Sequence, residues 1–133
     1  MDSGIRYGLL IGLLAAGATA PPLAAQAADS LPEGVTQAMV TRGKAVWSGA
    51  GLCVACHGPA GKGGIGPDLT DGEWLHHDGS YDALVKQITA GVPLNEAKTG
   101  QMMPPRGGGA INDADLRAVA AYVWTLSRRP PRS

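Results

Sequence analysis

Residues 53–57 read Cys-Val-Ala-Cys-His, and they contain both cysteines of the chain. Two thiols three positions apart, followed directly by an imidazole, are the attachment signature of c-type haem. Each thiol can add across one vinyl group of the porphyrin to form a thioether, and the histidine is then held beneath the ring as an iron ligand. We therefore expect one covalently attached haem c per chain, bound by Cys53 and Cys56, with His57 on the iron.

Two other kinds of site use the same spacing of cysteines. A redox dithiol of the thioredoxin kind should lie within alternating strands and helices, and no such alternation is present in this sequence. A structural zinc site needs two further Cys or His ligands at close spacing, for which His76 and His77 are the available side chains. Both interpretations fit the sequence less well than haem attachment does.

The sixth position of a haem iron needs a distal ligand, and its identity decides the function. The candidates are Met39, Met102, Met103, His76 and His77. Only the paired methionines lie in a loop rich in Gly and Pro and far enough along the chain to reach the opposite face of the ring. A thioether sulfur is a soft ligand that favours reduced iron and raises the reduction potential.

Between the two methionines, the sequence favours Met103. It precedes Pro104, which makes its backbone extended and removes a nearby N–H donor, so that a stiff loop can present the sulfur to the iron. We expect Met103 as the distal ligand, with Met102 as the alternative.

The sequence outside residues 53–57 predicts an all-α protein. Helical spacing of apolar residues predicts helices over about 36–49, 80–91 and 112–127, with Ser80 and Asn112 as N-caps. Residues 52–79 have Gly and Pro at short intervals and no sustained periodicity, which is typical of a loop wrapped over something. The chain of 133 residues has 20 Gly and no Phe, so a flat cofactor could supply the apolar centre that the side chains lack.

The first residues predict a secretory signal peptide. An apolar run over residues 8–20 follows Arg6 and precedes Ala25-Gln26-Ala27, a small-residue cleavage pattern. The run is short for a membrane span, which needs about 20 residues, and Pro21-Pro22 would interrupt a longer helix. We expect residues 1–27 to be removed before Ala28 and residues 28–133 to form one cytochrome c domain in the periplasm or another exported location. An uncleaved membrane anchor is the alternative.

The formal charge is balanced, with 11 basic and 11 acidic residues. Nothing in this balance favours nucleic acid or an anionic membrane surface as a partner. We expect redox proteins as partners, and neither nucleic acid nor a small-molecule substrate.

These features resemble the cytochrome c superfamily, and more closely the monohaem domains of cbb-type haem-copper oxidase subunits and related small periplasmic cytochromes. The resemblance runs from about Gly43 to Ser127. The matching residues, in chain order, are Gly43, Trp47, residues 53–57, Gly66-Pro67-Asp68-Leu69, Trp74, Gly91, Met103-Pro104 and Ala121-Tyr122-Val123.

The resemblance implies a small cytochrome c fold, with three or more helices around one haem. It also implies that the Pro67 carbonyl accepts a hydrogen bond from His57, and that Gly43 lets the first and last helices cross closely beside Tyr122. Two features depart from the family: the doubled Met102-Met103, and an apolar N-terminal run too short for the membrane anchor that the oxidase subunits usually carry.

Three functions are compatible with this resemblance. The first is an electron carrier with His/Met ligation that shuttles single electrons in the periplasm and is not itself an enzyme. The second is a haem c subunit of a larger oxidoreductase complex, docked to a membrane respiratory complex. The third is a haem enzyme or ligand sensor, which would need an open or labile sixth position. The electron carrier is the function that the sequence favours.

Overall fold

The computed structural model describes residue 1 and residues 30–128 of the chain. The predicted signal peptide and its cleavage site before Ala28 lie outside the described residues, apart from Met1. The described part consists of helices and loops, and its one sheet-like pairing is an isolated bridge between Val92 and Met103. This confirms the all-α prediction.

Three helices form the frame of the domain: α2 (Gln37–Ser48), α4 (Tyr81–Ala90) and α5 (Asp113–Leu126). Each begins at a side chain that accepts a hydrogen bond from a backbone N–H of the first turn: Thr36 from Met39, Ser80 from Ala83 and Asn112 from Asp115. Such caps satisfy N–H groups that have no partner inside the helix. The three predicted helices and the two predicted N-caps are therefore confirmed.

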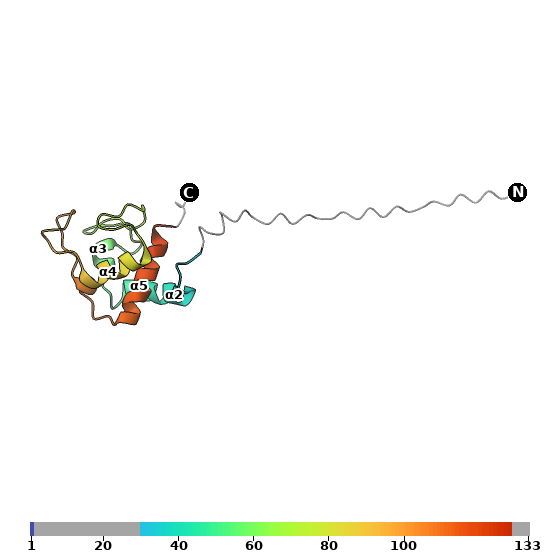
Figure 1. Cartoon of the computed structure of the whole chain (residues 1–133), viewed down its shortest axis with the longest axis horizontal. Helices are drawn as coiled ribbons and strands as arrows, with labels where there is room; N and C mark the ends of the chain where they lie inside the picture. The colour runs from blue at the N-terminus through green and yellow to red at the C-terminus, as the bar shows by residue number, and fades with distance from the viewer. Residues whose placement is uncertain (2–29, 129–133) are drawn as a thin grey trace.

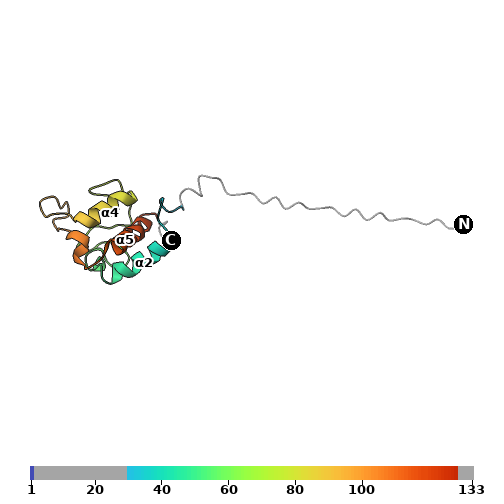
Figure 2. The ribbon, with the colours of Figure 1, turned by 60° about the horizontal axis from the view of Figure 1, so that its bottom comes forward.

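Helix α5 lies between α2 and α4 and packs against both (Figures 1 and 2). Its side chains Val119, Ala120 and Ala121 are completely buried, because this helix is covered on both sides. The α2–α5 crossing is the tighter one. A Cβ atom on Gly43 would overlap the backbone carbonyl of Ala118 and would lie 2.9 Å from Cβ of Tyr122, so only glycine permits this approach.

Aromatic packing continues the α2–α5 contact toward the centre of the domain. Trp47 is 1% exposed, and its ring meets that of Tyr122 edge to face, with centroids 5.7 Å apart. The same indole donates from Nε1 to the carbonyl of Gly58, 3.2 Å away. The close crossing at Gly43 beside Tyr122 was implied by the family resemblance, and it is confirmed.

The long loop between α2 and α4 differs from the prediction at one place. Residues Val54–His57 form a single helical turn, α3, where the sequence predicts irregular structure. Four residues are too few to show helical periodicity, so the pattern of apolar residues could not reveal it. A 3₁₀ turn over Pro105–Gly108 was missed for the same reason.

Aspartates shape the remainder of this loop. Asp68, Asp71 and Asp78 each accept, through Oδ1, a hydrogen bond from the backbone N–H two residues further on. These bonds are Asx turns, in which a short side chain replaces a backbone acceptor. The pKa of Asp68 is lowered mainly by a hydrogen bond from the Thr70 hydroxyl and then by the bond from the Thr70 N–H, whereas the pKa of Asp78 is lowered mainly by the bond from the Ser80 N–H, because each bond stabilises the charged carboxylate. These three aspartates therefore stabilise turns of the loop.

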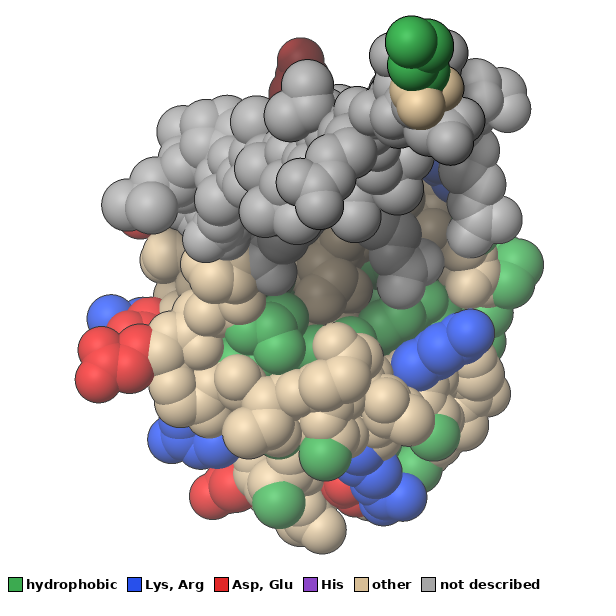
Figure 3. All heavy atoms as spheres, turned by 90° about the vertical axis from the view of Figure 1, so that its right-hand side faces the viewer, with side chains coloured by type: hydrophobic (Ala, Val, Ile, Leu, Met, Phe, Trp, Pro, Cys, Tyr) green, Lys and Arg blue, Asp and Glu red, His purple; other side chains and the backbone are tan. Residues whose placement is uncertain are grey.

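Acidic and basic side chains are interspersed on the face shown in Figure 3, with apolar side chains between them. No single sign of charge dominates the part of this face that is not drawn in grey. The arrangement agrees with the balanced composition of the chain.

Candidate functional site

A large cavity opens between α3, α4, α5 and the loops around them. Its empty volume is about 1110 Å³, counting the part that opens to solvent. Core side chains form its floor, among them Trp47, Leu84, Val119 and Val123. Binding pockets for small molecules and cofactors usually span roughly 300–1,000 Å³ and have mostly apolar walls, so the cavity has the size and character of a cofactor site.

Both cysteines line this cavity at the same end. Cys53 precedes α3 and Cys56 lies within it, so the helical turn brings the two side chains to one face. Neither takes part in a disulfide, and both are partly buried. Burial is the main cause that raises the pKa of the Cys53 thiol. The site thus presents two free thiols one helical turn apart.

His57, at the end of α3, is buried, at 9% exposure. Its Nδ1 lies 3.0 Å from the carbonyl oxygen of Pro67. Because a carbonyl can only accept, Nδ1 carries the proton, and Nε2 keeps its lone pair. Burial lowers the pKa of His57 and outweighs the opposing effect of the Pro67 bond. The imidazole is therefore neutral near pH 7, as an iron ligand must be.

The contact with Pro67 was implied by the resemblance, but the part played by Gly66 was not foreseen. A Cβ atom at Gly66 would lie 2.8 Å from Cε1 and 3.0 Å from Nδ1 of His57. Glycine therefore allows the loop to lie directly against the imidazole ring. The available signal was a Gly-Pro pair shortly after the attachment motif, which indicates a turn but does not say what the turn approaches.

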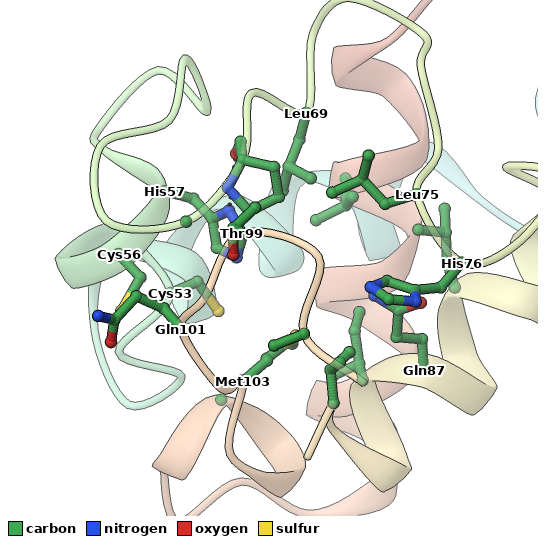
Figure 4. A pocket seen from close by; sticks show the side chains of 18 of the residues that line it. Cys53, Cys56, His57, Leu69, Leu75, His76, Gln87, Thr99, Gln101 and Met103 are labelled. Carbon is green, nitrogen blue, oxygen red and sulfur yellow. Dashed lines mark hydrogen bonds between the residues drawn. The ribbon is translucent and has the colours of Figure 1, made fainter. Parts of the chain in front are cut away.

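Met103 lines the cavity across from His57 (Figure 4). Its backbone is held by two hydrogen bonds with Val92: its N–H donates to the Val92 carbonyl at 2.9 Å, and its carbonyl accepts from the Val92 N–H at 2.8 Å. Gly91 lies so close to this bridge that a Cβ atom there would overlap the Met103 carbonyl. The side chain of Met103 is half-buried and packs against the core.

The other distal candidates lie elsewhere. Met102 is at the rim of the cavity and 52% exposed. Met39 packs against the core from α2 and does not line the cavity. His76 and His77 both line it: His76 is exposed, whereas the ring of His77 is half-buried and stacks on Trp74 with centroids 4.9 Å apart. Of the two histidines, His77 is therefore the one partly shielded from solvent.

The donor set fits c-type haem. One cavity collects two thiols, one neutral imidazole with a free Nε2, and one thioether sulfur, which are the groups that covalent attachment and axial ligation require. Within residues 30–128, no group of three or more His, Cys, Asp or Glu side chains is close enough to hold a metal ion by itself. The ligands of a structural zinc site are therefore not assembled in that part of the chain.

Among the residues that the structure describes, none forms a helix that is both long enough and apolar enough to cross a membrane.

Comparison with known proteins gives one family. Residues 38–123, well over half of the chain, match the family model described as cytochrome c oxidase, cbb3-type, subunit III. The chain is 38% identical over 82 residues to the cbb3-type cytochrome c oxidase subunit CcoP of Rubrivivax gelatinosus. This match covers 61% of this chain and 24% of that protein. It is 37% identical over 83 residues to the cbb3-type oxidase subunit FixP of Bradyrhizobium diazoefficiens. This match covers 60% of this chain and 28% of that protein.

A different redox protein is also similar. A subunit of the nicotinate dehydrogenase of Pseudomonas putida is 30% identical over 149 residues, which cover 95% of this chain and 12% of that protein. The chain spans less than a third of the length of each of these relatives. No solved structure matches it significantly.

The matched segment contains α4, most of α2 and α5, the cavity and the whole donor set described above. It begins in the first turn of α2 and ends within α5. The chain therefore belongs to the cbb3-type oxidase subunit III family of cytochrome c domains, whose cofactor is a covalently bound haem c.

Proposed function

We propose that this electron-transfer domain holds its haem through thioethers to Cys53 and Cys56, with His57 and Met103 as the two axial iron ligands. The observation that carries the proposal is the cavity itself, because these four side chains line it together although they come from distant segments of the chain. Bound haem supplies an iron that changes its charge by one electron.

Contacts within the protein would set the strength and the position of the two axial ligands of that iron. Pro67 fixes the tautomer and the orientation of His57, which increases the basicity of Nε2 as a ligand. The Val92 pairing holds the Met103 backbone in place in a stiff loop. With both axial positions taken by the protein, no position is left for a substrate. This supports an electron carrier over a haem enzyme or a ligand sensor.

The partners that fit this site are other redox proteins. The chain is similar to subunits of cbb3-type oxidases and of a nicotinate dehydrogenase, which are both oxidoreductases. We propose that the domain shuttles single electrons in the periplasm. A haem c domain within a larger membrane or periplasmic oxidoreductase complex is the second candidate, because all these relatives are named as subunits.

A redox titration combined with carbon monoxide tests the electron-carrier function. We expect the purified holoprotein to take up one electron per chain reversibly, and the reduced protein to show no rapid change of its absorption spectrum with carbon monoxide, since a filled sixth position cannot accept that ligand. Rapid and stoichiometric binding of carbon monoxide would instead support a ligand-binding or enzymatic haem.

The export of the domain is a separate prediction. The apolar run over residues 8–20 and the Ala25-Gln26-Ala27 pattern support cleavage before Ala28. Mass spectrometry of the protein from its native host should find the N-terminus at or close to Ala28, in the periplasmic or secreted fraction. A chain that begins at Met1 and is released only by detergent would show that the apolar run is a retained anchor.

A further inference from the structure

Asp68 directly follows Pro67, whose carbonyl oxygen lies 3.0 Å from Nδ1 of His57. Its Oδ1 accepts two hydrogen bonds from Thr70, one from the backbone N–H and one from the hydroxyl, both at 2.7 Å. The hydroxyl of Thr70 in turn accepts a hydrogen bond from the ammonium group of Lys62 at 2.5 Å. A hydroxyl has one proton to donate and lone pairs that accept, so both bonds can form together. Lys62, Thr70 and Asp68 thus form one network next to the carbonyl that orients His57.

The backbone around this network is closed by a further hydrogen bond. The N–H of Leu69 donates to the carbonyl of Gly61 at 2.8 Å. The Asx turn at Asp68 fixes the backbone that follows the peptide bond between Pro67 and Asp68. Rotation of that peptide would strain both the turn and the loop closure. The side chain of Asp68 therefore helps to hold the Pro67 carbonyl toward His57.

The carboxylate of Asp68 is charged near pH 7. Its pKa is lowered mainly by the bond from the Thr70 hydroxyl and then by the bond from the Thr70 N–H, and burial opposes these bonds with a smaller effect. Asp68 also lines the main cavity, whose lining includes no Lys or Arg within residues 30–128. Lys62 lies 3.8 Å from Oδ2, but its side chain is 71% exposed, so water screens the pair. The negative charge is therefore only partly compensated.

We propose that Asp68 is a positioning residue for electron transfer, which holds the Pro67 carbonyl toward His57 and whose carboxylate lowers the reduction potential. The inference rests on the proposed function, with His57 as an axial ligand. Oxidised iron carries one more positive charge than reduced iron, so a nearby carboxylate favours the oxidised state. A fixed hydrogen bond at Nδ1 increases the basicity of Nε2, which acts in the same direction. The electron comes from a redox partner protein, and no bond to Asp68 is formed or broken.

Asp71, in the same loop, provides a matched control. Its Oδ1 accepts a hydrogen bond from the N–H of Glu73 at 2.9 Å, so it forms the same kind of turn as Asp68. Asp71 is exposed and does not line the main cavity. Asn in place of Asp keeps an oxygen that accepts and removes the charge. Asp68→Asn and Asp71→Asn therefore remove the same charge from one loop and differ in where that charge lies.

The test compares the reduction potentials of the holoproteins, measured by redox titration at neutral pH and low salt. We expect Asp68→Asn to raise the equilibrium constant for reduction about threefold, which is about 28 mV at 59 mV per tenfold change. Asp71→Asn should change it by much less. Lys62→Gln should lower it, because this variant removes a positive charge from the same network.

Asp68→Ala tests the positioning role, because it removes the accepting oxygen as well as the charge. In the ferric protein, the NMR shifts of the haem methyl groups depend on how the axial ligands are oriented. We expect a changed pattern of these shifts in Asp68→Ala and the wild-type pattern in Asp68→Asn, which keeps the acceptor.

Equal potentials of Asp68→Asn and Asp71→Asn would overturn the role of the carboxylate, and wild-type methyl shifts in Asp68→Ala would overturn the positioning role. The near-infrared band of methionine bound to ferric iron gives an independent check on the proposed function. If the wild type lacks that band, the Met103 assignment fails. The comparison of Asp68→Asn with Asp71→Asn still decides the role of Asp68, which acts on the His57 side of the iron.

Discussion

Substituting both Cys53 and Cys56 by Ala should give a polypeptide that carries no haem in a denaturing gel and is largely unfolded in solution. Thioethers survive denaturation, whereas axial coordination alone does not. The loss of structure follows from the cavity: its volume of about 1110 Å³ lies beside the core residues Trp47, Leu84 and Val119, and without haem these lose their central packing partner. A domain of this size is stable by only about 5–15 kcal/mol, so the loss should remove most of that free energy.

Far-ultraviolet circular dichroism and thermal unfolding measure this effect. The single variants Cys53→Ala and Cys56→Ala are matched controls, because each keeps one thioether, and they should retain haem and most of the helical signal. A haem-free double variant with native helix content and a cooperative thermal transition would contradict the view that haem is the centre of the core. Haem that stays on the denatured double variant would contradict attachment through these cysteines.

Substituting Met103 by Ala should open the sixth position of the iron. We expect the loss of the weak near-infrared band of sulfur bound to ferric iron, binding of water or small ligands, and a lower reduction potential. The decrease should be on the order of 0.1 V, a fraction of the roughly 0.8 V range that axial ligands span. The neighbouring Met102→Ala is the control and should change none of these properties, since Met102 is 52% exposed at the rim.

The backbone pairing of Met103 with Val92 makes the result of Met103→Ala easier to interpret. If the loop were loose, Met102 could move into the vacant position, and Met103→Ala would look almost normal; the two backbone hydrogen bonds between Met103 and Val92 oppose that shift. The double variant separates the cases. A band that disappears in Met102→Ala and persists in Met103→Ala would show that Met102 is the ligand. A low-spin, six-coordinate iron without the band in all three variants would point to His76 or His77.

The local features of the three main helices could be predicted from the sequence, because they depend on neighbouring residues. Ser80 and Asn112 cap their helices through N–H groups three residues away. The apolar face of α5, with Leu116, Val119 and Val123, is buried as its helical spacing indicates. The turn α3 escaped prediction because its four residues are too short to show a period.

In the candidate site, too, the local features could be predicted from the sequence, whereas a contact between separate segments could not. The motif at residues 53–57 carries its chemistry within one helical turn, so sequence alone was enough to predict haem c, and the family comparison agrees. The preference for Met103 over Met102 rested on Pro104, a local argument. Val92, in another part of the same loop, holds the Met103 backbone in place. No pattern in the sequence predicts that pairing.

The sequence by itself determined the three main helices, the haem attachment motif and the family, since each depends on residue types at short, regular spacing. Only the tertiary structure decided which separate groups meet: Gly66 lies against the ring of His57, and Val92 pairs with Met103. These contacts join segments separated by loops rich in glycine. The path of such loops is set by backbone conformations and by packing around a shared centre, which residue order alone does not specify.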